Sequence, residues 1–159
     1  MKIIVGIGAM RVTRDPADVL ITHALGACIG VTIYDPAVKV GGLLRFILPQ
    51  SPPHRENFPM NPFIFADTGI PLLLHQAHQF GAENNRLQVK VAGGSQFLDH
   101  PRFFDVGKKN HAAVRKILLQ NDIRIQAEEI GGTGNWAIGL EISTGRVWVK
   151  KSGEGEKDI

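Results

Sequence analysis

The chain has 159 residues, of which 43% are hydrophobic and 21% are charged, so it can bury a core of its own without disulfides or metals. The net charge is +3, and Lys and Arg form no block with interleaved aromatic residues, which argues against nucleic acid as a partner. No apolar run is long enough to cross a membrane or to act as a signal peptide. Cys28 is the single cysteine, which excludes an internal disulfide and favours the reducing cytoplasm.

The chain begins with strand-like segments rich in Ile, Val and Thr. Gly26 permits a tight turn within residues 25–28, because glycine adopts backbone angles that other residues resist. Residues 29–34 and 41–48 are joined by a short turn and predict a hairpin. A later pair around Ser143-Thr144-Gly145 predicts a second hairpin. The strands expected from these patterns are 2–7, 19–22, 29–34, 41–48, 87–91, 123–130, 137–142 and 146–150.

Two segments carry apolar residues at helical spacing, 66–80 and 106–120, and each predicts an amphipathic helix. Asp67 or Thr68 is expected to cap the first helix. Before it lies a proline-rich segment, 49–62, which predicts a long loop of the kind that often carries function.

Strands and helices do not alternate strictly, and this order predicts an α+β fold with two helices packed on a mostly antiparallel sheet. We expect a single domain over residues 1–151, because no linker or repeat interrupts the pattern. The segment 152–159 is charged and contains glycine, and we expect it to be a flexible tail.

Cys28 is the first candidate for chemistry, because it lies between the tight turn and a strand. A thiolate is a strong nucleophile, and the amides of Ala27, Cys28 and Ile29 could stabilise an oxyanion beside it. The competing interpretation is that Cys28 is a small buried hydrophobic residue without reactivity.

Other candidates are weaker from the sequence alone. Thr22 could orient a catalytic group or bind substrate, but it is also an ordinary strand residue. His75 and His78 share a helix face and could bind a metal. No third ligand is suggested by spacing, so we expect neither a metal nor a cofactor. The glycine pairs match no complete phosphate-binding pattern and are better explained by turns.

Taken together, these segments resemble the CheD family, the chemoreceptor glutamine deamidases of bacterial and archaeal chemotaxis. The resemblance covers nearly the whole chain and rests on six segments. Its most specific parts are the segments at 22–28 and 41–49. The six segments are Thr-His-Ala-Leu-Gly-Ala-Cys at 22–28, GGLLRFILP at 41–49, FADT at 65–68, KVAGG at 90–94, AEEIGG at 127–132 and STGR at 143–146.

The resemblance implies an α/β sandwich that hydrolyses glutamine side-chain amides of chemoreceptors with a Cys–His pair and a supporting threonine. Carried over by position, Cys28 is the nucleophile and Thr22 is the threonine. The family histidine falls on position 45, where this chain has Arg45. A second departure is Ala27, since a serine commonly precedes the cysteine.

Arg45 changes the expected mechanism, because a guanidinium stays protonated and cannot shuttle a proton as an imidazole does. It could still favour a thiolate at Cys28 by its charge. His54, in the proline-rich loop, is the best-placed substitute by sequence.

Two functions therefore compete. One is a deamidase that acts on a chemoreceptor cytoplasmic domain. The other is a weak or inactive binding module of the same fold, which docks on chemoreceptors or on a CheC-type phosphatase. Cys28 favours the first and Arg45 favours the second. The third possibility, which uses no family knowledge, is a cytoplasmic α+β domain of unknown role.

Overall fold

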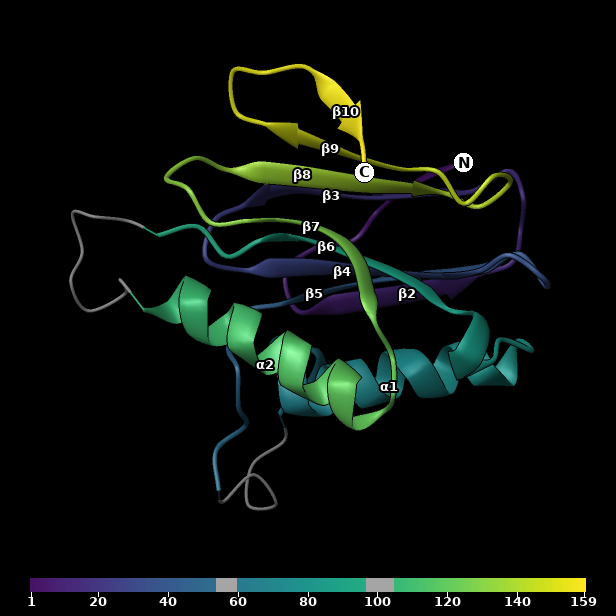
Figure 1. Ribbon diagram of the computed structural model, residues 1–159, viewed down its shortest axis with the longest axis horizontal. Coiled ribbons are helices and arrows are strands. Elements are labelled where there is room, and N and C mark those ends of the chain that lie inside the picture. Colours follow the sequence, from purple (N-terminus) through teal and green to yellow (C-terminus); the bar gives the residue numbers. More distant parts are fainter. Residues whose placement is uncertain (54–59, 97–104) are drawn as a thin grey trace.

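The computed structural model describes residues 1–53, 60–96 and 105–159. In these ranges ten strands form two five-stranded sheets, and two α-helices cover one of them (Figure 1). The α+β fold with two helices on a mostly antiparallel sheet is therefore confirmed, and the strands are divided between two layers. No helix in the described part of the chain is long and apolar enough to cross a membrane.

The first sheet has the order β1-β3-β8-β9-β10. Its β1–β3 pair is parallel, and its other pairs are antiparallel. The strands are β1 (Lys2–Ile4), β3 (Val19–Leu25), β8 (Trp136–Glu141), β9 (Val147–Lys151) and β10 (Glu156–Asp158).

The second sheet has the order β2-β5-β4-β6-β7. Only its β6–β7 pair is parallel among the pairs described. The strands are β2 (Ala9–Thr13), β4 (Ile29–Asp35), β5 (Val40–Phe46), β6 (Gln88–Gly93) and β7 (Ile125–Ile130).

The helices α1 (Ala66–Gln79) and α2 (Val106–Gln120) lie on the face of the second sheet that points away from the first sheet (Figure 1). One core fills the space between helices and sheet, and its largest fully buried side chains include Phe46, Leu73 and Leu118. A second core lies between the sheets and includes Leu25 and Leu140. Every residue of β4 and β5 is buried, because these central strands face both cores.

Three local predictions differ from the structure. Strand β2 was not expected, and it pairs with β5 at the sheet edge. The capping prediction for α1 is wrong: Phe65 is the N-cap without a side-chain hydrogen bond. The Asp67 carboxylate instead accepts hydrogen bonds from Ser51, and the Thr68 hydroxyl donates to the carbonyl of Pro62.

The third difference concerns residues 152–159, which were expected to be flexible. The structure has strand β10 there, paired with β9. Lys157 forms an ion pair with Glu129 of β7, and Lys90 Nζ donates to the carbonyl of Ile159 at 2.6 Å. These contacts connect the C-terminal end of the first sheet to the second sheet. The residues in contact are far apart in the sequence, so no local pattern predicts them.

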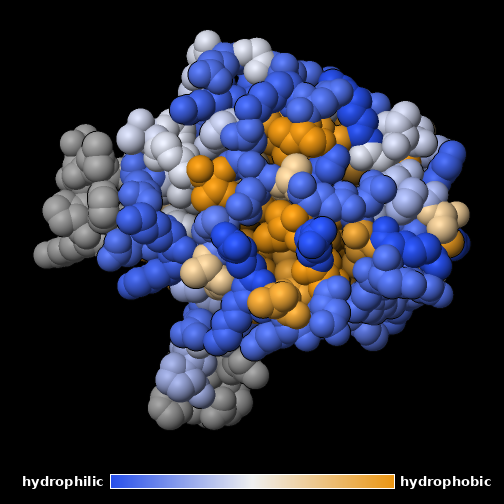
Figure 2. Space-filling view, viewed as in Figure 1, coloured by the Kyte–Doolittle hydropathy of each residue, from blue (hydrophilic) through white to orange (hydrophobic). Residues whose placement is uncertain are grey.

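The exposed side of α2 and strand β7 form an open groove of about 630 Å³. Figure 2 shows hydrophobic surface in this region, surrounded by hydrophilic residues. Leu119, Ile123 and Ile125 line the groove together with Arg115 and Lys116. The groove lies toward the C-terminal end of α2, whereas Asn110, near the start of that helix, contacts the turn before β4.

Candidate active site

The turn that carries Cys28 connects β3 to β4. Leu25 ends β3 in a bulge of the β3–β8 pairing, and Ile29 begins β4. The side chain of Cys28 is partly buried and packs against the core between the two sheets. The chain does change direction between the two predicted strands, but the left-handed residue is Ala24 and not Gly26, and the thiol lies where the two layers meet.

Three consecutive carbonyl groups of this turn are hydrogen-bonded from other parts of the fold. The Ser95 amide donates to the Gly26 carbonyl at 2.8 Å, and the Gly94 amide donates to the Cys28 carbonyl at 2.9 Å. Between them, Asn110 Nδ2 donates to the Ala27 carbonyl at 2.9 Å. The backbone of the turn is thus fixed by the two residues that follow β6 and by α2.

Two glycines allow these segments to approach one another. A Cβ at Gly93, whose φ is 116°, would lie 2.2 Å from the Cys28 carbonyl oxygen. A Cβ at Gly107 would lie 2.4 Å from the Gly94 oxygen and 2.5 Å from that of Ser95. Both distances are too short for any side chain, so glycine is required for the packing itself at these positions.

The fixed carbonyls determine where the amide groups of the turn point. Residues 1–53, 60–96 and 105–159 contain no cis peptide bond, and in a trans peptide the N–H points opposite to the carbonyl of the preceding residue. The amides of Ala27 and Cys28 therefore point away from Ser95 and Asn110. Neither amide donates a hydrogen bond within the described residues, so both are available donors beside the thiol.

Arg45 lies on β5 with only 7% of its surface exposed. Its Nη1 donates to Thr22 Oγ1 at 3.2 Å and to the His23 carbonyl, and its Nη2 donates to the Ala24 carbonyl at 3.1 Å. Its Nε is buried and has no hydrogen-bond partner in the described part of the chain. Arg45 therefore holds the end of β3, where Ala24 has a left-handed backbone with a φ of 55°.

The structure brings Thr22 and Arg45 together, the two residues that the family resemblance places beside the cysteine. Gly30 is the register partner of Arg45, and Cys28 lies two residues before it. A Cβ at Gly30 would lie 3.2 Å from the Thr22 side chain. Thr22 and Arg45 thus lie beside the first residues of β4, close in the fold to the turn that carries the thiol.

The described histidines do not supply the missing imidazole. His23 is exposed, on the strand face opposite to the fully buried Thr22. His111 contacts Glu128, and His78 contacts Asn84. His75 is exposed on α1, and the described part of the chain contains no group of three potential metal ligands. The predicted substitute, His54, lies outside the described residues.

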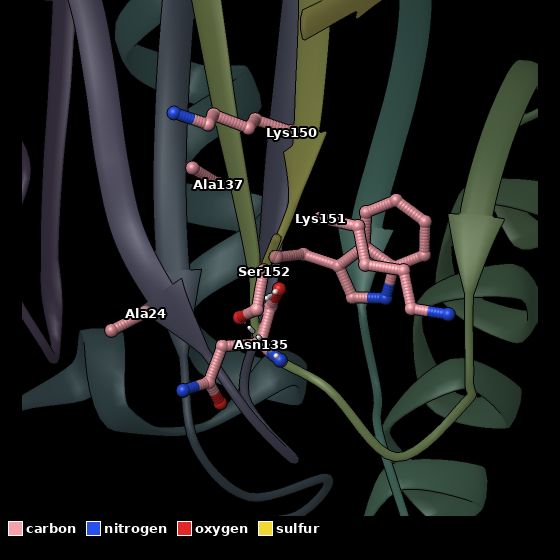
Figure 3. A pocket seen from close by; sticks show the side chains of 7 residues that line it. Ala24, Asn135, Ala137, Lys150, Lys151 and Ser152 are labelled. Atoms are coloured by element: carbon pink, nitrogen blue, oxygen red, sulfur yellow. Dashed lines mark hydrogen bonds between the residues drawn. The ribbon is translucent and has the colours of Figure 1, made fainter. Parts of the chain in front are cut away.

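A shallow cavity of about 240 Å³ adjoins the turn at Ala24. Lys150, Lys151 and Asn135 line it together with Trp136 (Figure 3). Lys151 Nζ lies 5.6 Å from the centre of the Trp136 ring, a cation–π distance. Neither lysine forms an ion pair among the described residues, so this cavity of the first sheet is positively charged.

Comparison with known proteins identifies the family. The model of the family described as CheD chemotactic sensory transduction matches residues 47–151. A probable chemoreceptor glutamine deamidase CheD 1 of Syntrophus aciditrophicus is 46% identical over 151 residues, which cover 95% of this chain and 94% of that protein. The chain belongs to the CheD family.

Other relatives extend this CheD assignment to archaea. A probable chemoreceptor glutamine deamidase CheD of Solibacter usitatus is 44% identical, with 96% of this chain and 90% of that protein covered. One of Pyrococcus horikoshii is 39% identical, with 96% and 93% covered. The family-model match begins after Arg45, whereas these relatives span the segment with Thr22 and Cys28.

Ser95, Gly93 and Asn110 were not singled out as site residues from the sequence. The contact of Asn110 with Ala27 spans 83 positions, so no local pattern predicts it. The available signal was an asparagine at a position of α2 that faces the interior, since buried amides need specific partners.

Proposed function

We propose that this chain is a glutamine deamidase of the CheD type, with Cys28 as the nucleophile and the amides of Ala27 and Cys28 as oxyanion donors. The observation that carries the proposal is the hydrogen-bonded turn, because its fixed carbonyls leave these two amides free beside a partly buried thiol. Preorganised amides of this kind stabilise the charge that develops during acyl transfer.

In the proposed reaction the Cys28 thiolate attacks the side-chain carbon of a glutamine. The carbonyl electron pair moves to oxygen, which the two amides bind. Collapse of this intermediate expels ammonia, which takes up a proton, and leaves a thioester. Water then attacks the thioester, so that glutamate forms and the thiol is restored. No metal or cofactor takes part in these steps.

Arg45 and Thr22 are assigned a supporting role in this scheme. The Arg45 guanidinium donates to Thr22 and to two carbonyls, so it holds the β3 end in place and releases no proton. Loss of a general acid–base group reduces rates by about 10²–10⁴-fold. We therefore expect slow deamidation, with water or a residue outside the described ranges, such as His54, protonating the leaving ammonia.

The substrate is assigned by two considerations. The relatives are named chemoreceptor glutamine deamidases, and the lysines beside Ala24 offer positive charge to an acidic segment. We propose that a chemoreceptor cytoplasmic domain presents its glutamine to Cys28 with acidic residues near Lys150 and Lys151. The free thiol of Cys28 supports a location in the reducing cytoplasm.

A second candidate function is favoured by Arg45. Its buried guanidinium fills the family histidine position and is committed to the β3 end, as a structural residue in a binding module would be. In that case the chain docks on a chemoreceptor, or on a CheC-type phosphatase, without appreciable turnover.

Mass spectrometry of receptor peptides separates the two functions. A chemoreceptor cytoplasmic domain is incubated with the wild type, with Cys28→Ala and with Arg45→His, and glutamine-to-glutamate conversion is followed over time. We expect slow conversion by the wild type, none by Cys28→Ala, and a rise of at least about tenfold in Arg45→His. Conversion absent from the wild type but present in Arg45→His supports the binding module. Conversion that persists in Cys28→Ala contradicts the proposed nucleophile.

A further inference from the structure

Asn110 is a fully buried polar residue on α2, in the helix layer and far from Cys28 in the sequence. Its Nδ2 donates both of its protons, one to the Ala27 carbonyl at 2.9 Å and one to the Ile47 carbonyl at 2.7 Å. Its Oδ1 is buried and has no hydrogen-bond partner among the residues that the structure describes. The orientation of the amide is unambiguous, because the reversed amide would place an oxygen against two carbonyl oxygens.

The hydrogen bond to Ala27 acts on the peptide that joins Ala27 to Cys28. The Ala27 carbonyl and the Cys28 N–H belong to the same planar unit, so a donor that holds the carbonyl also sets the direction of the N–H. Without that donor, this peptide could rotate and turn the Cys28 N–H away from the thiol. We infer that Asn110 is a positioning residue, which aims the Cys28 amide at the oxyanion of a substrate bound to the thiol.

The second hydrogen bond of Asn110 attaches its side chain to the end of β5. Ile47 follows directly after β5, the strand that carries Arg45. One side-chain amide therefore sets the distance between the Cys28 turn and the end of β5. The unpaired Oδ1 supports the same conclusion. A buried acceptor without a partner costs free energy, and this arrangement is the one in which both protons of Asn110 reach the two carbonyls.

The inference rests on the proposed role of Cys28 as nucleophile, but it can be tested without a receptor. Acetylation of Cys28 by p-nitrophenyl acetate passes through an oxyanion: the thiolate attacks the ester carbonyl, and p-nitrophenolate leaves with its electron pair. Alkylation by iodoacetamide displaces iodide and forms no oxyanion. Both reactions consume the thiolate, so the ratio of their rate constants cancels differences in thiol ionisation and isolates oxyanion stabilisation.

The experiment measures both rate constants on the full chain, with Cys28→Ala giving the background at other nucleophiles. We expect Asn110→Ala to lower the ratio of acetylation to alkylation by about 10–100-fold, since loss of one oxyanion donor reduces rates by about 10²–10³-fold. The alkylation rate should stay close to that of the wild type.

Two further variants keep the test valid if Asn110→Ala folds poorly. Asn110→Asp preserves the side-chain shape but replaces the donor by an oxygen, and it should lower the ratio in the same way. The matched control is Thr32→Val, which also removes one buried hydrogen bond, the 2.9 Å bond from Thr32 to the Lys90 carbonyl. It should leave the ratio unchanged. Circular dichroism verifies the fold of each variant.

Several outcomes overturn the inference. A ratio that is unchanged in both Asn110 variants, or equally reduced in Thr32→Val, assigns Asn110 a purely structural role. A wild-type ratio no higher than that of N-acetylcysteinamide means that no oxyanion site exists. Receptor deamidation can fail for lack of a proton donor while the ratio still responds to Asn110, so failure of the proposed function and failure of this inference are distinguishable.

Discussion

Arg45 donates to three oxygen atoms at one strand end, the Thr22 hydroxyl and the carbonyls of His23 and Ala24. A histidine at this position has fewer donors and a shorter side chain, so it could not hold all three oxygens. Compared with the histidine that the CheD resemblance implies at this position, Arg45 cannot transfer protons but stabilises a left-handed backbone at Ala24. In this chain the strand end is fixed at the expense of acid–base chemistry.

Gly93 provides a second test at single-residue scale. We expect Gly93→Ala to lower the free energy of unfolding by about 1–3 kcal/mol through backbone strain, or by more because of the collision described next. The φ of Gly93 is 116°, and a Cβ at this position would collide with the Cys28 carbonyl oxygen. We also expect the rate of Cys28 alkylation to change as the turn shifts. Urea denaturation and iodoacetamide labelling measure the two effects.

The matched control is Gly153→Ala, whose φ is also positive, at 79°, but whose Cβ would meet nothing within 4 Å. It should show the backbone strain alone and leave the alkylation rate unchanged. An equal change of that rate in both variants would show that the contact with Cys28 does not matter.

Among the elements, the helices were the most predictable. Apolar residues at helical spacing predict 66–80 and 106–120, and the structure has Ala66–Gln79 and Val106–Gln120. Strand β2 could not be predicted, because its burial does not alternate. Met10 is partly buried and Arg11 is exposed, but Val12 and Thr13 are both buried. The strand forms because β5 offers an open edge, which is a tertiary effect. The division of the strands into two sheets is likewise set by long-range pairing.

The candidate site was predictable only where it is local in sequence. The turn at Cys28 follows from the flanking strands, although its left-handed residue is Ala24 and not the expected Gly26. The choice of Thr22 and Arg45 follows from the family resemblance. The fixation of the turn by Ser95 and Asn110 depends on contacts between distant segments. Such contacts leave no periodic signal in the chain.

Asp35, the last residue of β4, predicts that the stability of the fold decreases in acid. Burial alone would raise the pKa of Asp35, but hydrogen bonds from Arg86 and from the amides of Glu83 and Ala37 outweigh it and hold the pKa below its usual value. A lowered pKa in the folded state stabilises the fold above the unfolded pKa of about 4, and this stability is lost as the pH falls through the folded value.

We therefore expect the free energy of unfolding to decrease as the pH drops below about 4. Asp35→Asn should be less stable than the wild type at pH 7, by about 1–3 kcal/mol, and the difference should shrink in acid. Urea titrations from pH 7 to pH 3 measure both. A constant difference across this range would contradict the assigned ion pair with Arg86.

At the scale of the whole molecule, the first sheet, the second sheet and the helices form three layers (Figure 1). The C-terminal segment connects two of them through Lys157–Glu129 and Lys90–Ile159. The Cys28 turn is another connection between the same two sheets, since β3 belongs to the first sheet and β4 to the second. The candidate site therefore depends on how both sheets are placed.

The complete burial of β4 has a consequence for the dynamics of the protein. This strand lies between β5 and β6. Its residues face alternately the core under the helices and the core between the two sheets. It cannot become exposed unless both layers separate, so its amides should exchange with deuterium only through global unfolding. Edge strands β7 and β10 should exchange through smaller openings. Native-state exchange in low urea measures this, and early exchange at Val31 would contradict it. The thiol two residues before Gly30 is then attached to the slowest-opening part of the molecule.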